Sequence, residues 1–198
     1  MVAGPRALAR LVKDIRACRI CADILEPNPV IRVSHTARIL IAGQAPGMRV
    51  HKTGLPFNDP SGDRLRDWMG IDRETFYDQK RIAVAAMAFC FPGYDANGAD
   101  IPPPKICAQH WRTRLFETLP PIPLILLVGS YAQTWHLGDA AKSNMTETVK
   151  AWRRYAPNYI ALPHPSWRNN GWLKKNPWFE RDVLPYLRKR VQASLSSS

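Results

Sequence analysis

The sequence predicts an α/β fold, a three-layer α/β/α sandwich with a central, mainly parallel four-stranded sheet. Four short apolar runs, at 38–43, 81–88, 124–129 and 159–163, suit strands that are buried on both faces. Helical patterns lie between these runs, and strands alternating with helices are typical of a parallel sheet covered on both sides. The length of 198 residues suits one domain over 1–198.

The expected elements follow in order along the chain. Residues 5–17 have apolar side chains at helical spacing, and the first strand follows at 38–43. Further helices are expected at 61–70, 107–118, 130–137, 145–154 and, after the last strand, 178–193. Ser61 is a candidate N-cap for the helix at 61–70. Residues 194–198 are expected to form a frayed tail.

The charge balance points to a polyanionic partner. Lys and Arg number 28 against 16 Asp and Glu, a net charge of +12, and the chain also has seven Trp and six Tyr. Basic surfaces bind phosphates and aromatic rings stack on bases, so nucleic acid is the favoured partner over a merely soluble basic surface. The longest apolar stretch, 122–129, is too short to span a bilayer, and the N-terminus lacks an apolar signal core. We therefore expect a cytoplasmic protein with no membrane partner.

Cysteine spacing predicts a metal centre. The chain has four cysteines, Cys18 and Cys21 as a close pair and Cys90 and Cys107 as a wide pair. Four thiolates suit one tetrahedral zinc ion or one four-iron cluster. Two disulfides or four unrelated buried thiols are the alternatives, and the expected reducing compartment disfavours disulfides.

Two loops that follow predicted strands hold the residues best suited to chemistry, because sites in parallel α/β sheets lie at the carboxyl ends of the strands. The first, 43–62, begins GQAPG, where Gly43 and Gly47 permit a tight turn. The last, 163–177, places His164 between two prolines, where it can donate a hydrogen bond to a developing oxyanion. Arg168, Lys174 and Lys175 follow among Trp167, Trp172 and Trp178, a mixture that suits phosphate contacts and wedging against bases.

Four motifs together resemble the uracil-DNA glycosylase superfamily, especially its iron–sulfur branches. They are GQAPG at 43–47, KTGLPF at 52–57, HPSWRN at 164–169 and the cysteine pattern C-x2-C…C-x16-C, in the order and at the strand ends that the family has. The resemblance covers nearly the whole chain. It implies a monofunctional enzyme that flips uracil out of DNA and hydrolyses its glycosidic bond.

The resemblance also implies residue roles. Phe57 would stack on the uracil ring, and His164 would hydrogen-bond uracil O2 as the base leaves. The loop that begins GQAPG would contact the base. A structural 4Fe–4S cluster would be ligated by Cys18, Cys21, Cys90 and Cys107, with zinc as the less favoured occupant. The expected base-binding residues are Gln44, Ala45, His51, Phe57 and Asn58, and the expected DNA-binding residues are Ser166, Arg168, Asn169, Asn170 and Lys174.

The chain departs from the family pattern at three places. Gln44 stands where an iron–sulfur branch has Glu, and Val50 and His51 stand where its loop has acidic residues. Asp59 is the best remaining carboxylate, so we expect it to position water or stabilise the sugar cation, with His51 as the second candidate and a helix-capping role as the alternative. Ala86 stands where the family has a base-recognising Asn, so Asn58, Gln44 or a backbone amide must replace it.

These departures keep other functions open. One is a glycosylase for another deaminated base, such as hypoxanthine. Another is a protein that binds uracil or abasic DNA with weak turnover. A third is an RNA-binding module that a structural metal stabilises. A monomer is expected for an enzyme that encloses a flipped base.

Overall fold

The computed structural model describes residues 4–196, and its centre is a four-stranded sheet. The strands are β1 (Ile39–Ala42), β2 (Ile82–Val84), β3 (Leu124–Val128) and β4 (Tyr159–Leu162). Their order is β2-β1-β3-β4 and every pairing is parallel. The predicted α/β sandwich is therefore confirmed, with a fully parallel sheet.

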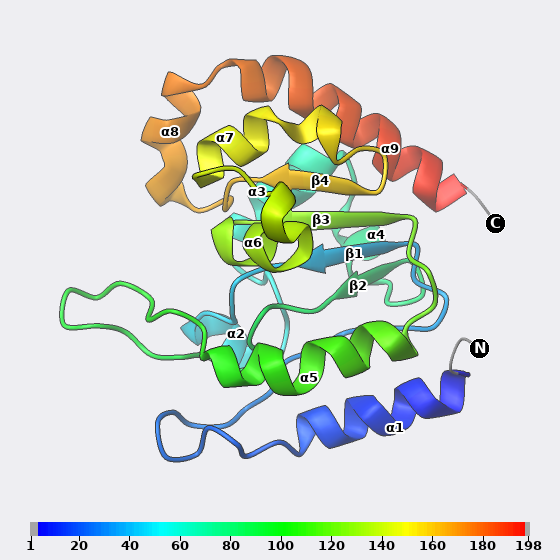
Figure 1. Cartoon of the computed structure of the whole chain (residues 1–198), viewed down its shortest axis with the longest axis vertical. Coiled ribbons are helices and arrows are strands. Elements are labelled where there is room, and N and C mark those ends of the chain that lie inside the picture. The colour runs from blue at the N-terminus through cyan, green and yellow to red at the C-terminus, as the bar shows by residue number, and fades with distance from the viewer. Residues whose placement is uncertain (1–3, 197–198) are drawn as a thin grey trace.

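Helices cover the sheet on both sides (Figure 1). They are α1 (Pro5–Arg16), α2 (Met48–Thr53), α3 (Pro60–Met69), α4 (Arg73–Tyr77), α5 (Lys105–Thr118), α6 (Ser130–Leu137), α7 (Met145–Lys150), α8 (Asn170–Lys175) and α9 (Leu184–Ser196). Short 3-10 turns occupy Gly138–Ala140, Trp152–Arg154 and Trp167–Asn169, and a π-helical turn, Phe179–Val183, leads into α9.

Alternate strand residues face two separate apolar layers. On one side Leu40, Ala83 and their neighbours pack against α1, α5 and α6, with Ile15, Trp111 and Leu115 buried among them. On the other side Ile39 and Ile41 pack against α3, α4 and α9. Because both faces of the sheet are buried, successive residues of each strand are all apolar, which explains the unbroken apolar runs in the sequence.

Three local predictions need correction. β2 ends at Val84, because the chain then leaves regular pairing and Met87 and Ala88 hydrogen-bond the loop after β1. α9 continues to Ser196 rather than fraying from 194, because Val191 and Ser194 pack into the core; residues 197–198 lie outside the described part. The N-cap of α3 is Asp59 and not Ser61, since the Asp59 side chain accepts the Gly62 N–H.

Within residues 4–196 no helix combines the length and the hydropathy needed to cross a membrane.

Candidate active site

The loops after β1 and β2 are joined at the carboxyl edge of the sheet. The Met87 N–H donates to the Gly43 carbonyl at 2.8 Å, and the Ala88 N–H donates to the Gln44 carbonyl at 3.1 Å. A third link reaches the loop after β4, where Arg64 of α3 donates to the Ser166 carbonyl at 3.1 Å. The two glycosylase-like loops thus meet at one edge, as expected for parallel strands.

Phe57 is held in a backbone conformation that a side chain rarely adopts. Its φ is +54°, and no other non-glycine residue in the described part has a positive φ. Such backbone costs of order 1 kcal/mol or more and is found at functional sites when the surroundings enforce it. Tyr77 donates its hydroxyl to the carbonyls of Pro56 and Phe57 at 3.0 and 3.1 Å, and Arg66 donates to the Phe57 carbonyl at 3.4 Å.

The Phe57 ring lies against the first loop. It packs edge-on to Phe76 with 6.1 Å between ring centroids. Its Cζ atom lies 3.7 Å from the place where a side chain on Gly43 would begin. The ring, the Gly43 backbone and the segment that hydrogen-bonds this loop therefore lie together at the strand ends.

His164 follows β4 and is mostly buried. Burial lowers its pKa, outweighing the Asp59 and Asp100 carboxylates, which raise it, while Arg168 lowers it further. The Ser166 N–H donates to His164 Nδ1 at 3.2 Å, so the neutral ring has its proton on Nε2. A neutral imidazole with a fixed Nε2–H is a hydrogen-bond donor for a developing oxyanion.

Asp59 caps α3 and also acts on His164. One carboxylate oxygen accepts the Gly62 N–H at 2.9 Å, so the helix-capping interpretation of this residue is confirmed. Its charge also raises the pKa of His164. Among residues 4–196 no group donates a hydrogen bond to its second oxygen, which is left for water or substrate.

The other candidates in the first loop have mixed surroundings. The Asn58 amide oxygen already accepts from Arg73 at 3.0 Å. His51 pairs with Glu26 at 3.5 Å, and its carbonyl accepts from Asn28 at 2.7 Å, which ties it to the chain that follows Cys21. Gln44 and Ala45 are partly exposed, and the Gln44 side chain makes no hydrogen bond within the described part.

The segment 164–178 divides into exposed and structural residues. Trp167 has 71% of its surface exposed, and Arg168, Asn170 and Lys174 are also exposed. Arg168 pairs with Asp100 at 3.8 Å. Asn169 instead donates to the His164 carbonyl at 2.7 Å, so it braces the histidine loop.

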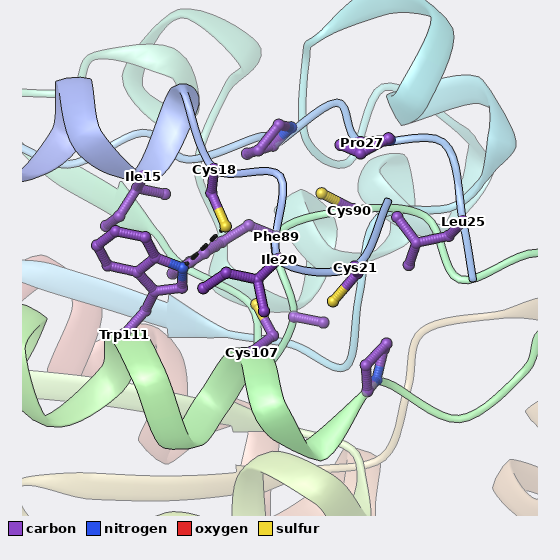
Figure 2. Close-up of a pocket in the computed structure, with 13 residues that line it drawn as sticks. Ile15, Cys18, Ile20, Cys21, Leu25, Pro27, Phe89, Cys90, Cys107 and Trp111 are labelled. Carbon is purple, nitrogen blue, oxygen red and sulfur yellow. Dashed lines mark hydrogen bonds between the residues drawn. The ribbon is translucent and has the colours of Figure 1, made fainter. Parts of the chain in front are cut away.

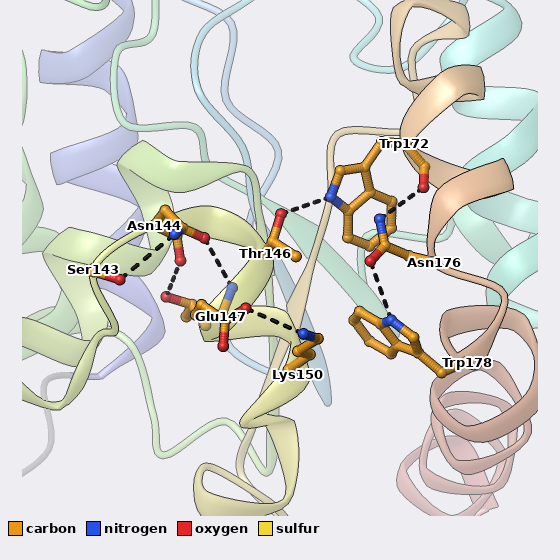
Figure 3. A network of polar contacts seen from close by, with 9 residues as sticks. Ser143, Asn144, Thr146, Glu147, Lys150, Trp172, Asn176 and Trp178 are labelled. Atoms are coloured by element: carbon orange, nitrogen blue, oxygen red, sulfur yellow. Dashed lines mark hydrogen bonds and ion pairs between the residues drawn. The ribbon is translucent and has the colours of Figure 1, made fainter.

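Trp172 and Trp178 do not fit the predicted wedging role. Their rings pack edge-on at 5.7 Å, and their indole N–H groups donate to Thr146 and Asn176 (Figure 3). They are partly buried braces between α7, α8 and the turn into α9. Of the three predicted tryptophans, Trp167 alone is exposed enough to meet a nucleic acid.

All four cysteines line one cavity (Figure 2). The other walls of this hollow are apolar, among them Ile15, Phe89 and Trp111. The cysteines form no disulfide, so that alternative is not borne out.

The Trp111 indole donates to the Cys18 sulfur at 3.3 Å. Burial raises the pKa of the Cys90 thiol to about 11 and that of Cys107 to about 12.

In the described part, no three His, Cys, Asp or Glu side chains are placed to hold one metal ion. The four sulfurs instead surround a cavity between the end of α1 and the start of α5.

Residues 31–188 match the family model for the uracil DNA glycosylase superfamily. The chain belongs to this superfamily. The matched range includes Phe57, Asp59 and His164, and it begins after Cys18 and Cys21. Among solved structures, the chain is similar to wild-type SMUG2 from Pedobacter heparinus, with 15% identity, a TM-score of 0.42 and coverage of 94% of this chain and 96% of that one.

Membership of the uracil-DNA glycosylase superfamily indicates a DNA glycosylase, an N-glycosyl hydrolase that acts in DNA repair. Several residues of the site could not be found from the sequence. Asp100, Arg66 and Tyr77 act through contacts between distant parts of the chain, and no local spacing signals them. Gly62 had a weak signal, since a glycine inside a predicted helix costs about 1 kcal/mol relative to alanine and so needs a local reason.

Proposed function

We propose that this superfamily member is a monofunctional uracil-DNA glycosylase of base excision repair. The observation that supports it most is the strained Phe57 at the same sheet edge as a neutral, oriented His164. An aromatic ring offers a stacking surface for a flipped base, and an Nε2–H donor stabilises negative charge on a base oxygen. The proposed location is the cytoplasm, and the proposed assembly is a monomer.

His164 and Asp59 have distinct roles in the proposed hydrolysis of the glycosidic bond. As the C1′–N1 bond breaks, both electrons go to uracil, and the negative charge spreads onto O2, where His164 Nε2–H donates. The sugar develops oxocarbenium character, which the Asp59 carboxylate stabilises while its free oxygen positions water. Water adds to C1′ and loses a proton, and the uracil anion takes up a proton from solvent. No lysine nucleophile is needed, so the strand stays intact.

DNA binding follows from charge and exposure. The net charge of +12 supplies phosphate attraction, and Arg168, Asn170 and Lys174 are exposed beside Trp167. We propose that this segment enters the groove and occupies the gap that the flipped nucleotide leaves. Arg168 must then leave Asp100, an exposed pair whose separation costs little.

We also propose that Cys18, Cys21, Cys90 and Cys107 hold a 4Fe–4S cluster. One cavity lined by four thiols and apolar side chains suits a cluster that four cysteines ligate. Bound there, the cluster would tie the α1 end and the α5 start to the loop after β2 and take no part in bond cleavage. The Trp111 N–H would donate to one thiolate.

Protein purified without air should be brown and contain about four irons per chain. Cys107→Ser should lower the iron content and the thermal stability together, because it removes a ligand from the cavity wall. Ser143→Ala, an exposed change on the far side of the sheet, should alter neither. A colourless protein with one zinc ion per chain would contradict the cluster.

The test of the function is excision on labelled oligonucleotides with one central uracil, hypoxanthine, xanthine or cytosine, in single and double strands. We expect a break at uracil after alkali and none before it, because a monofunctional enzyme leaves an abasic site. Cytosine should stay intact. No product from uracil, with the DNA still bound in a gel shift, would overturn the assignment and favour another damaged base or a binding role.

The second candidate is a protein that binds damaged DNA with weak turnover. It is favoured by Gln44 and Ala86, which replace acidic and amide side chains of the family pattern that the chain resembles. Substitution of His164 separates the two candidates and is treated in the Discussion.

A further inference from the structure

Arg112 is an unusual buried cation. Its side chain has no exposed surface, and within the described part it forms no ion pair with a carboxylate. One terminal nitrogen donates to the carbonyls of Ala85 at 3.1 Å and Ala86 at 2.8 Å. The other contacts His136 Nε2 at 2.7 Å.

Arg112 stays charged despite its burial. Burial lowers its pKa to about 10, so the guanidinium is protonated at neutral pH. Burial and Arg112 lower the pKa of His136 to about 3, so the imidazole is neutral and accepts the hydrogen bond. The guanidinium also lies near the faces of Phe116 and Trp135, at 5.1 and 4.8 Å from the ring centroids. Burying an unpaired cation is costly, and an apolar side chain would fill this space more cheaply.

The geometry of one peptide unit shows what the cation can do. The Ala85 carbonyl and the Ala86 N–H belong to the same peptide, and in a trans peptide these groups point in opposite directions. Arg112 lies in α5, on the face of the sheet that also packs α1. The Ala86 N–H is therefore directed away from Arg112, as is the Met87 N–H, which donates to the Gly43 carbonyl. The Ala86 N–H has no hydrogen-bond partner in residues 4–196.

Ala86 also lies beside the proposed base site. It is partly exposed, whereas Ala85 and Met87 on either side are buried. Its neighbour Met87 is bonded to Gly43, against which the Phe57 ring packs. An unpaired backbone donor thus adjoins the segment against which the Phe57 ring packs.

We propose that the Ala86 N–H recognises a keto oxygen of the flipped base and that Arg112 is its positioning residue. This inference rests on the proposed glycosylase function. The charge-assisted hydrogen bond to the Ala85 carbonyl polarises the peptide and strengthens the N–H as a donor. Uracil offers O4 and hypoxanthine offers O6 to such a donor, whereas cytosine presents an amino group there. The site thus selects deaminated bases by their keto group.

The test compares single-turnover excision of uracil and of 4-thiouracil, whose sulfur is a poor hydrogen-bond acceptor, by wild-type protein and Arg112→Met. We expect the wild type to prefer uracil by about tenfold, the discrimination of one hydrogen bond. Arg112→Met should excise uracil about 10- to 100-fold more slowly, and its preference should fall below about twofold. Arg112→Lys, which keeps a cation, should recover part of the preference.

The control is Leu187→Ala, a buried change in α9 in the opposite apolar layer. It should lower stability and leave the uracil preference at the wild-type value. His136→Gln retains an acceptor for Arg112 and should behave like the wild type. If Arg112→Met does not fold, Arg112→Lys carries the test, because its preference should fall between the wild-type value and none. Equal excision of both bases by the wild type, or an unchanged preference in Arg112→Met, would overturn the inference. Absence of all uracil excision by the wild type would instead reject the proposed function.

Discussion

His164→Ala should reduce single-turnover uracil excision by about 100- to 1,000-fold, the usual effect of removing one oxyanion donor. The Nε2–H is oriented by the Ser166 N–H on the other ring nitrogen, and burial keeps the imidazole neutral. The proposed hydrogen bond to uracil O2 would strengthen only as the base becomes an anion, so the loss should fall on the chemical step. The dissociation constant for uracil-containing DNA should change by less than about threefold.

The control for this change is His110→Ala, which removes an exposed histidine from α5 and should leave both quantities unaltered. Circular dichroism and thermal unfolding of His164→Ala establish that the fold persists. Equal losses of excision and of DNA affinity would show that His164 contributes to binding rather than to bond cleavage, and would favour the damage-binding role.

Gly62→Ala should have an effect of similar size through Phe57. A side-chain carbon at position 62 would lie 1.8 Å from the Phe57 carbonyl oxygen and 2.6 Å from its carbonyl carbon. These are backbone atoms, so Phe57 would have to move from the positive φ that sets its ring direction. We expect excision to fall by at least about 100-fold and the free energy of unfolding to drop by roughly 2–4 kcal/mol, the range of strongly destabilising changes.

Gly4→Ala is the matched control, because nothing lies within 4 Å of a side chain there and its φ of −76° is ordinary. It should change stability by less than about 1 kcal/mol. If Gly62→Ala excises uracil at the wild-type rate, the strained conformation of Phe57 is not needed for the reaction.

Much of the fold could be predicted, because buried parallel strands and longer helices leave local patterns. The runs at 38–43, 124–129 and 159–163 contain β1, β3 and β4, and the patterns at 5–17 and 130–137 match α1 and α6. The short helices α2, α4 and α8 were not predicted, because five or six residues show too little periodicity. Likewise, the early end of β2 depends on hydrogen bonds to the loop after β1.

The site could be predicted only where a motif names the residue. Phe57 and His164 stand in recognisable segments, and the structure places both at the sheet edge. The positive φ of Phe57, the Asp100 charge near His164 and the Arg112 contact to Ala85 all join segments that are distant in sequence. For Trp172 and Trp178 the sequence predicts a role that the structure does not support. Their aromatic rings suit base contacts, but both side chains pack within the protein.

The most direct measurement is the mass of a uracil-containing oligonucleotide after incubation with the protein. The proposed function predicts one product of full chain length in which a hydroxyl group has replaced uracil, with free uracil in solution. That mass defines hydrolysis of the glycosidic bond without strand cleavage. An oligonucleotide recovered at its original mass, or one cut at the uracil position, would contradict a monofunctional uracil-DNA glycosylase.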